Sequence, residues 1–134
     1  MTTSRSRTLS VTIERDWRDV YAYASDPANL HHWAPGLGSG FVPDGDEWVL
    51  RDPGGKPLRM RFAQQNDWGV LDHDVFTPEG TVHIAMRVMP NGDGAEFTFL
   101  LLQMPGMTDA EFERDAGTVM GDLLRLKEIM EAGT

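Results

Sequence analysis

The sequence predicts an α+β fold in which a seven-stranded antiparallel sheet, with two short helices after its first strand, is covered by a long C-terminal helix. Three observations predict it. Turn signals rich in Gly, Pro, Asn and Asp recur at hairpin spacing, apolar residues alternate between them, and the C-terminal region switches to helical spacing. The 134 residues, 40% of them hydrophobic, suffice for one domain over residues 1–134 with an ordered core at about residues 8–131.

The first strand and the two helices after it are expected between residues 8 and 33. Residues 8–13 alternate apolar and hydroxyl side chains, which is typical of a half-buried strand. Asp16 can cap a helix over residues 17–24, and Pro27 stands at the first position of a second helix that ends near Trp33. Six further strands are expected near Phe41 and at residues 48–51, 58–64, 70–76, 81–89 and 96–104.

The C-terminal helix is predicted from its cap and its apolar stripe. Thr108 and Glu111 form a capping box, so the helix should begin after Thr108 and continue to about Glu131. Gly117 and Gly121 fall on the opposite face, where close approach of another chain would offset their low helix propensity, so we expect a monomer or a homodimer. The stripe that should face the sheet consists of Phe112, Ala116, Val119, Met120, Leu123, Leu126 and Met130.

Charge and composition exclude several classes of partner. The formal net charge of -9 repels nucleic-acid phosphates and the anionic surface of a membrane, so we expect neither a nucleic-acid partner nor stable membrane insertion. The absence of cysteine excludes disulfides and thiolate zinc sites. No apolar segment of signal-peptide length follows the polar N-terminus, so a cytoplasmic protein is expected.

Strand alternation turns His73 toward the face of the sheet that the C-terminal helix covers. A neutral imidazole there could hydrogen-bond a ligand carbonyl or act as a general acid or base. The alternative is a core histidine that is satisfied by a backbone carbonyl or a tyrosine hydroxyl. The same alternation turns outward, into cross-strand ion pairs, the charged side chains of Arg59, Arg61, Asp72, Asp74 and Arg87.

No metal site and no cofactor are predicted. Asp72, His73 and Asp74 are adjacent on a strand, so their side chains alternate between faces and cannot converge on one ion. His31 and His32 are neighbours on a short helix, where adjacent side chains are expected to diverge.

One segment carries a resemblance to a known family. VYAYASDP, residues 20–27, followed by Trp33, resembles the first-helix segment of the START-like SRPBCC superfamily, whose helix-grip fold has this order of elements. The superfamily includes polyketide cyclases, lipid-transfer domains and Hsp90 co-chaperone domains. The resemblance implies a curved sheet, a pocket and no shared catalytic motif. Four further stretches resemble a bacterial branch of this superfamily that is described as polyketide cyclase/dehydrase-like: residues 71–73, 86–88, 115 and 122–127.

Large apolar side chains are expected to line this pocket together with His73. The leading hypothesis is therefore a protein that binds a small hydrophobic or aromatic, polyketide- or lipid-like molecule. One alternative is a cyclase/dehydrase-type enzyme with His73 as general acid or base, and another is a co-chaperone-like interaction module. Residues 36–40 are either a lid or a plain connection. The candidate ligand contacts are Trp33, Trp48, Met60, Phe62, His73, Met86, Phe97, Phe99 and Met120.

Overall fold

The computed structural model describes residues 2–35 and 38–133. Its elements follow the predicted order of one strand, short helices, six strands and one long helix. In chain order they are β1 (Ser6–Ile13), α1 (Trp17–Ala24), the 3-10 helix η1 (Pro27–Asn29), α2 (Leu30–Trp33), β2 (Ser39–Asp44), β3 (Glu47–Arg51), β4 (Pro57–Phe62), β5 (His73–Thr77), β6 (Gly80–Asn91), β7 (Gly94–Leu102) and α3 (Asp109–Ala132).

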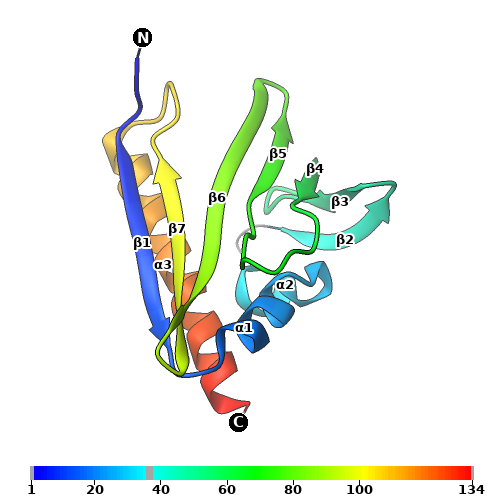
Figure 1. The fold of residues 1–134 in the computed structure, drawn as a ribbon. Helices are drawn as coiled ribbons and strands as arrows, with labels where there is room; N and C mark the ends of the chain where they lie inside the picture. The colour runs from blue at the N-terminus through cyan, green and yellow to red at the C-terminus, as the bar shows by residue number, and fades with distance from the viewer. Residues whose placement is uncertain (1, 36–37, 134) are drawn as a thin grey trace.

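The seven strands form one antiparallel sheet in the order β1-β7-β6-β5-β4-β3-β2. Strands β2 to β7 are a meander, and β1 joins it beside β7. Figure 1 shows the sheet bending so that β2, β3 and β4 turn away from β1, while α3 runs behind β1 and β7 and α1 and α2 lie below the bend. The predicted fold class is confirmed: this is a curved sheet gripping one long helix.

Strand β6 changes partner along its length. Residues from Gly80 to Ile84 pair with β5, and β6 pairs with β7 from Ala85 onward. Beyond the Ala85–Leu100 pair the two strands diverge, which Figure 1 shows at the upper end of β6 and β7. This divergence opens space between the sheet and the first half of α3.

Helix α3 begins and packs as its sequence predicts. The Thr108 hydroxyl accepts a hydrogen bond from Glu111 N at 3.1 Å, and the Glu111 carboxylate accepts one from Thr108 N at 2.9 Å. The predicted stripe faces the sheet, with Val119 and Met120 half-buried against the core. Its fully covered members are Phe112, Ala116, Leu123, Leu126 and Met130.

Several strand boundaries shift by one or two residues, and two elements differ more from the prediction. The helix expected through Trp33 is divided into η1 and α2, since Asp26 caps a 3-10 turn through Ala28 N. The strand expected from Val70 begins only at His73, where its pairing with β4 ends at Phe62. Before it, Leu71 N donates to Met86 O of β6 at 2.8 Å and Asp72 O accepts from Ala63 N at 2.9 Å.

The outward-facing charges form the expected ion pairs across strands. Arg59 contacts Asp44 at 2.9 Å, and Arg87 contacts Asp72 at 3.0 Å. Arg61 contacts Glu47 and His83 contacts Asp74 on the same face. These partly exposed pairs account for the charges without a ligand. Across residues 2–35 and 38–133, no helix combines the length and apolar character needed to span a bilayer.

Candidate functional site

A partly enclosed, mainly apolar cavity lies between the sheet and α3, with a volume of about 170 Å³. Its sheet wall is one continuous patch, because strand register brings inward-facing residues together. Phe62, His73 and Ile84 form one row across β4, β5 and β6, since Phe62 pairs with His73 and His73 with Ile84. Met86 and Phe99 pair in the next row across β6 and β7.

Three other parts of the chain complete the wall. Helix α3 supplies two pairs of residues spaced four apart: Val119 and Leu123 belong to its apolar stripe, and Thr118 and Asp122 lie beside the stripe. Helices α1 and α2 close one end, and the connection between β4 and β5 closes another side. From these segments the lining residues are Thr118, Val119, Asp122 and Leu123; Tyr21, Ala24, Ser25, Leu30, Trp33 and Ala34; and Ala63, Val70 and Leu71.

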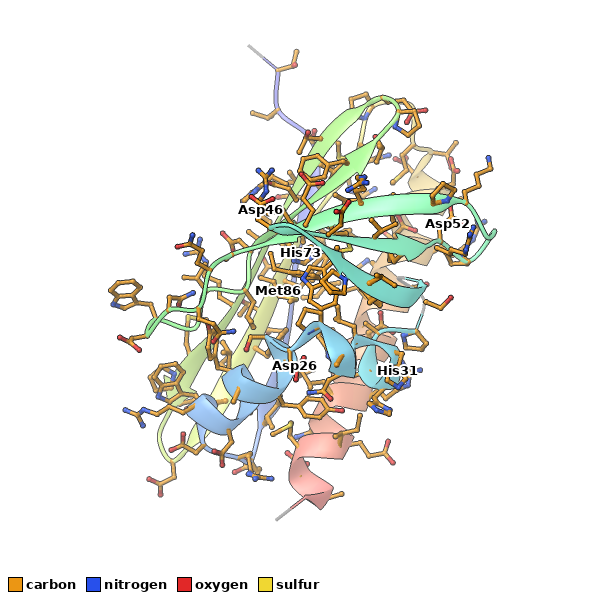
Figure 2. The ribbon with its side chains drawn as sticks, turned by 90° about the vertical axis from the view of Figure 1, so that its right-hand side faces the viewer. Asp26, His31, Asp46, Asp52, His73 and Met86 are labelled. Carbon is orange, nitrogen blue, oxygen red and sulfur yellow. The ribbon has the colours of Figure 1, made fainter. Side chains whose placement is uncertain are left out.

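Five of the nine predicted contact residues line this cavity: Trp33, Phe62, His73, Met86 and Phe99. Figure 2 shows His73 and Met86 near each other in the middle of the molecule.

The other four predicted residues are placed elsewhere. Trp48 and Met60 face each other across β3 and β4, toward the far end of the sheet. Phe97 is fully buried in the core, where it meets the Trp33 ring edge-on at 5.9 Å between centroids. Met120 packs against the core from the apolar stripe, whereas its stripe neighbours Val119 and Leu123 line the cavity.

His73 is the buried titratable side chain on the sheet wall, with 6% of its surface exposed. Its Nδ1 lies 3.1 Å from the carbonyl oxygen of Leu71, which can only accept, so Nδ1 carries the proton. Burial lowers the pKa of His73 below its ordinary value of 6.5, which favours the neutral ring. Nε2 is then an acceptor. The backbone-satisfied histidine expected as the alternative is therefore present, and donation to a ligand carbonyl does not fit this tautomer.

Asp122 faces the cavity from α3. Burial raises the pKa of its carboxyl group above the ordinary value of 3.8, although the Arg125 guanidinium opposes this shift. Arg125 Nη1 lies 3.1 Å from Asp122 Oδ1 and also donates to the Trp33 carbonyl oxygen at 3.1 Å. One guanidinium thus ties α3 to α2 at the cavity wall. Sequence reasoning missed Asp122, although its four-residue spacing from Thr118 beside the stripe was a usable signal.

The connection between β4 and β5 is held against α1 by hydrogen bonds. Asn66 N donates to the Tyr21 hydroxyl at 2.9 Å, and the Gln65 amide donates to Ser25 Oγ at 3.2 Å. The Asn66 side chain also accepts from Trp68 N and Val70 N, each at 3.0 Å. This segment is a structured side wall of the cavity. In the segment 36–40, expected as either a lid or a plain connection, residues 36 and 37 lie outside the described residues, and Ser39 begins β2.

A second cavity of about 180 Å³ lies where β6 and β7 diverge. It shares two wall residues, Ile84 and Phe99, with the first cavity. Other parts of its wall come from Val82, Leu101 and Met107. The two cavities therefore adjoin at Ile84 and Phe99.

The two adjacent histidines on α2 do not diverge as expected, since the ring centroids of His31 and His32 are 3.8 Å apart. Both are exposed, and Figure 2 shows His31 at the edge of the molecule beside α3. Within the described part of the chain, no group of three or more His, Asp or Glu side chains is arranged to hold a metal ion.

The fold and this cavity define an α+β helix-grip protein with an internal apolar pocket. No protein-family model matches the chain, and no curated protein is significantly similar to it in sequence. Solved structures do resemble it. An uncharacterised protein from Bacillus thuringiensis has a TM-score of 0.74 at 15% identity, with 94% of this chain and 98% of that chain covered.

Two further structures have the same fold. The Aha1 dimer from Colwellia psychrerythraea has a TM-score of 0.74 at 14% identity, with 97% of this chain and 98% of that chain covered. A protein in the dynemicin biosynthetic locus has a TM-score of 0.71 at 14% identity, with 96% of this chain but 48% of that chain covered. At these identities the likeness establishes the fold alone.

Proposed function

We propose that this chain binds a small hydrophobic or aromatic molecule in the cavity between the sheet and α3. The observation that carries the proposal is the cavity itself, with its volume of about 170 Å³ and its mainly apolar wall. An engineered apolar cavity of about 150 Å³ takes up benzene, so this volume suits a ligand of roughly one aromatic ring. The resemblance of residues 20–33 to the START-like SRPBCC superfamily supports the same function.

A cyclase/dehydrase-type activity is the second candidate, because one structural neighbour belongs to the dynemicin biosynthetic locus. In such a reaction the neutral His73 would act through Nε2 as a general base, since Nδ1–H is engaged with Leu71 O. A folded poly-β-ketone chain would need more space than a cavity of about 170 Å³ provides. Cavity size therefore favours binding of a smaller molecule over cyclisation of a long one.

A titration with toluene tests the proposed function, because toluene is a one-ring probe without polar groups. Two-dimensional amide NMR should show shifts confined to the cavity wall, with a dissociation constant of about 1 mM or lower. The variant Val119→Phe places a larger side chain on that wall and should abolish the shifts. The matched control is Val42→Phe, because Val42 is 58% exposed on β2 and lies outside the cavity lining.

The wild-type titration decides the outcome even where Val119→Phe folds poorly. Saturable shifts at the cavity wall support the proposal. Absence of saturable shifts up to the solubility limit of toluene, or equal binding by wild type and Val119→Phe, would overturn it.

A further inference from the structure

We infer that the ligand of this cavity donates a hydrogen bond to Nε2 of His73, so that the ligand class is a compact, ring-sized apolar molecule bearing one hydroxyl or N–H group, as a phenol does. The inference rests on the proposed function, and it specifies the polarity of the ligand that the cavity selects.

The direction of this hydrogen bond follows from the partner of Nδ1. The Leu71 carbonyl oxygen 3.1 Å away has no proton to give, so the Nδ1 proton is used and Nε2 presents a lone pair. Within the described residues, Trp33 Nε1 is the one side-chain polar atom sealed from water without a hydrogen-bond partner. Nε2 of His73 has no hydrogen-bond partner within the described residues either. Because Nε2 is not one of the sealed atoms, it must be accessible to a water-sized molecule at the cavity wall.

Two other side chains on the wall, Asp122 and Thr118, present acceptors to a ligand. Asp122, from the opposite side, is an acceptor that Arg125 satisfies in part. The Thr118 hydroxyl already donates to Arg114 O at 3.1 Å. The Tyr21 hydroxyl accepts from Asn66 N, and its own O–H is a donor that a ligand hydroxyl can also engage. A ligand that covers Nε2 without donating to it loses binding free energy, because the acceptor is then buried without a partner. The cavity therefore favours ligands that bring a donor to His73.

A cycle of two ligands and two proteins isolates this hydrogen bond. Phenol and toluene differ by a hydroxyl in place of a methyl group, and His73→Leu removes the acceptor while keeping an apolar side chain. The ratio of phenol affinity to toluene affinity should be about tenfold higher in wild type than in His73→Leu, as expected for a hydrogen bond to a buried acceptor. The matched control His31→Leu makes the same substitution on an exposed residue outside the cavity lining and should keep the wild-type ratio.

Two further probes and one spectrum complete the test. Anisole and benzaldehyde carry acceptors without a donor, so they should bind no better than toluene in either protein. In wild type, the ¹⁵N resonance of His73 Nε2 should move when phenol binds and remain in place with toluene. This spectrum tests the hydrogen bond to Nε2 without any variant.

An unchanged phenol-to-toluene ratio in His73→Leu, or a gain for benzaldehyde that depends on His73, would overturn the inference while leaving the proposed function intact. Failure of both toluene and phenol to bind wild type would overturn the inference together with the proposed function.

Discussion

At the scale of single residues, His73 combines opposing influences on one imidazole. Burial lowers its pKa, whereas the hydrogen bond to Leu71 O and the nearby charges of Asp72 and Asp74 raise it, and His83 lowers it further. Burial prevails, so the folded protein holds His73 neutral over a pH range in which an exposed histidine is protonated.

This shift predicts acid destabilisation linked to His73. The pKa of His73 is below 6.5 in the folded state and near 6.5 in the unfolded chain, so the unfolded chain binds more protons as pH falls through 6.5. The free energy of unfolding should therefore decrease from about pH 7.5 to about pH 5.5, and His73→Leu should flatten that decrease. Urea unfolding across this range measures it, with His31→Leu as the control. Equal pH slopes in wild type and His73→Leu would contradict the assignment.

At the scale of elements, the two faces of α3 differ in how they pack. Its apolar stripe is buried against the sheet, while the face carrying Gly117 and Gly121 meets no described atom that a methyl group would touch. Glycine at these positions destabilises the helix relative to alanine, and no contact within the described residues requires the absence of a side chain there.

Gly117→Ala should therefore raise the free energy of unfolding by about 1 kcal/mol, measured by urea denaturation. A control with the opposite sign is Gly69→Ala, because Gly69 has φ of +72° and an added Cβ would collide with the Val88 carbonyl oxygen. A loss of stability in Gly117→Ala that depends on protein concentration would instead indicate a second copy packed on this face of α3.

At the scale of the whole molecule, the cavity exists only where distant segments meet. Its wall joins α1, α2, the β4–β5 connection, four strands and α3, so unfolding destroys the site completely. A ligand that binds the folded chain and not the unfolded chain must therefore stabilise the fold.

Toluene at about ten times its dissociation constant should raise the free energy of unfolding of wild type by about 1.4 kcal/mol. The same concentration of toluene should leave the free energy of unfolding of Val119→Phe unchanged, because the phenylalanine side chain fills the cavity. Urea unfolding with and without toluene measures both values. An equal effect on the two proteins would indicate nonspecific solvent action in place of occupation of the cavity.

Local patterns in the sequence were sufficient for most of the fold. The capping box at Thr108 and Glu111, the alternation around His73 and the turn signals each act over a few residues, so strand faces and the start of α3 could be predicted. Alternation also placed Phe62 and Met86 on the wall. It could not separate them from Met60, which faces the same way two residues earlier on β4, because the distinction depends on the sheet's curvature.

The sequence by itself determined that β5 turns His73 toward the interior and that α3 presents an apolar stripe, since both follow from fixed backbone periodicity. Only the tertiary structure decided where the cavity falls, that Val119 and Asp122 line it while Met120 does not, and which nitrogen of His73 carries the proton. Those features depend on how far the strands bend and on contacts between segments that no local pattern encodes. The Leu71 carbonyl beside Nδ1 is what converts an inward histidine into a specific hydrogen-bond acceptor.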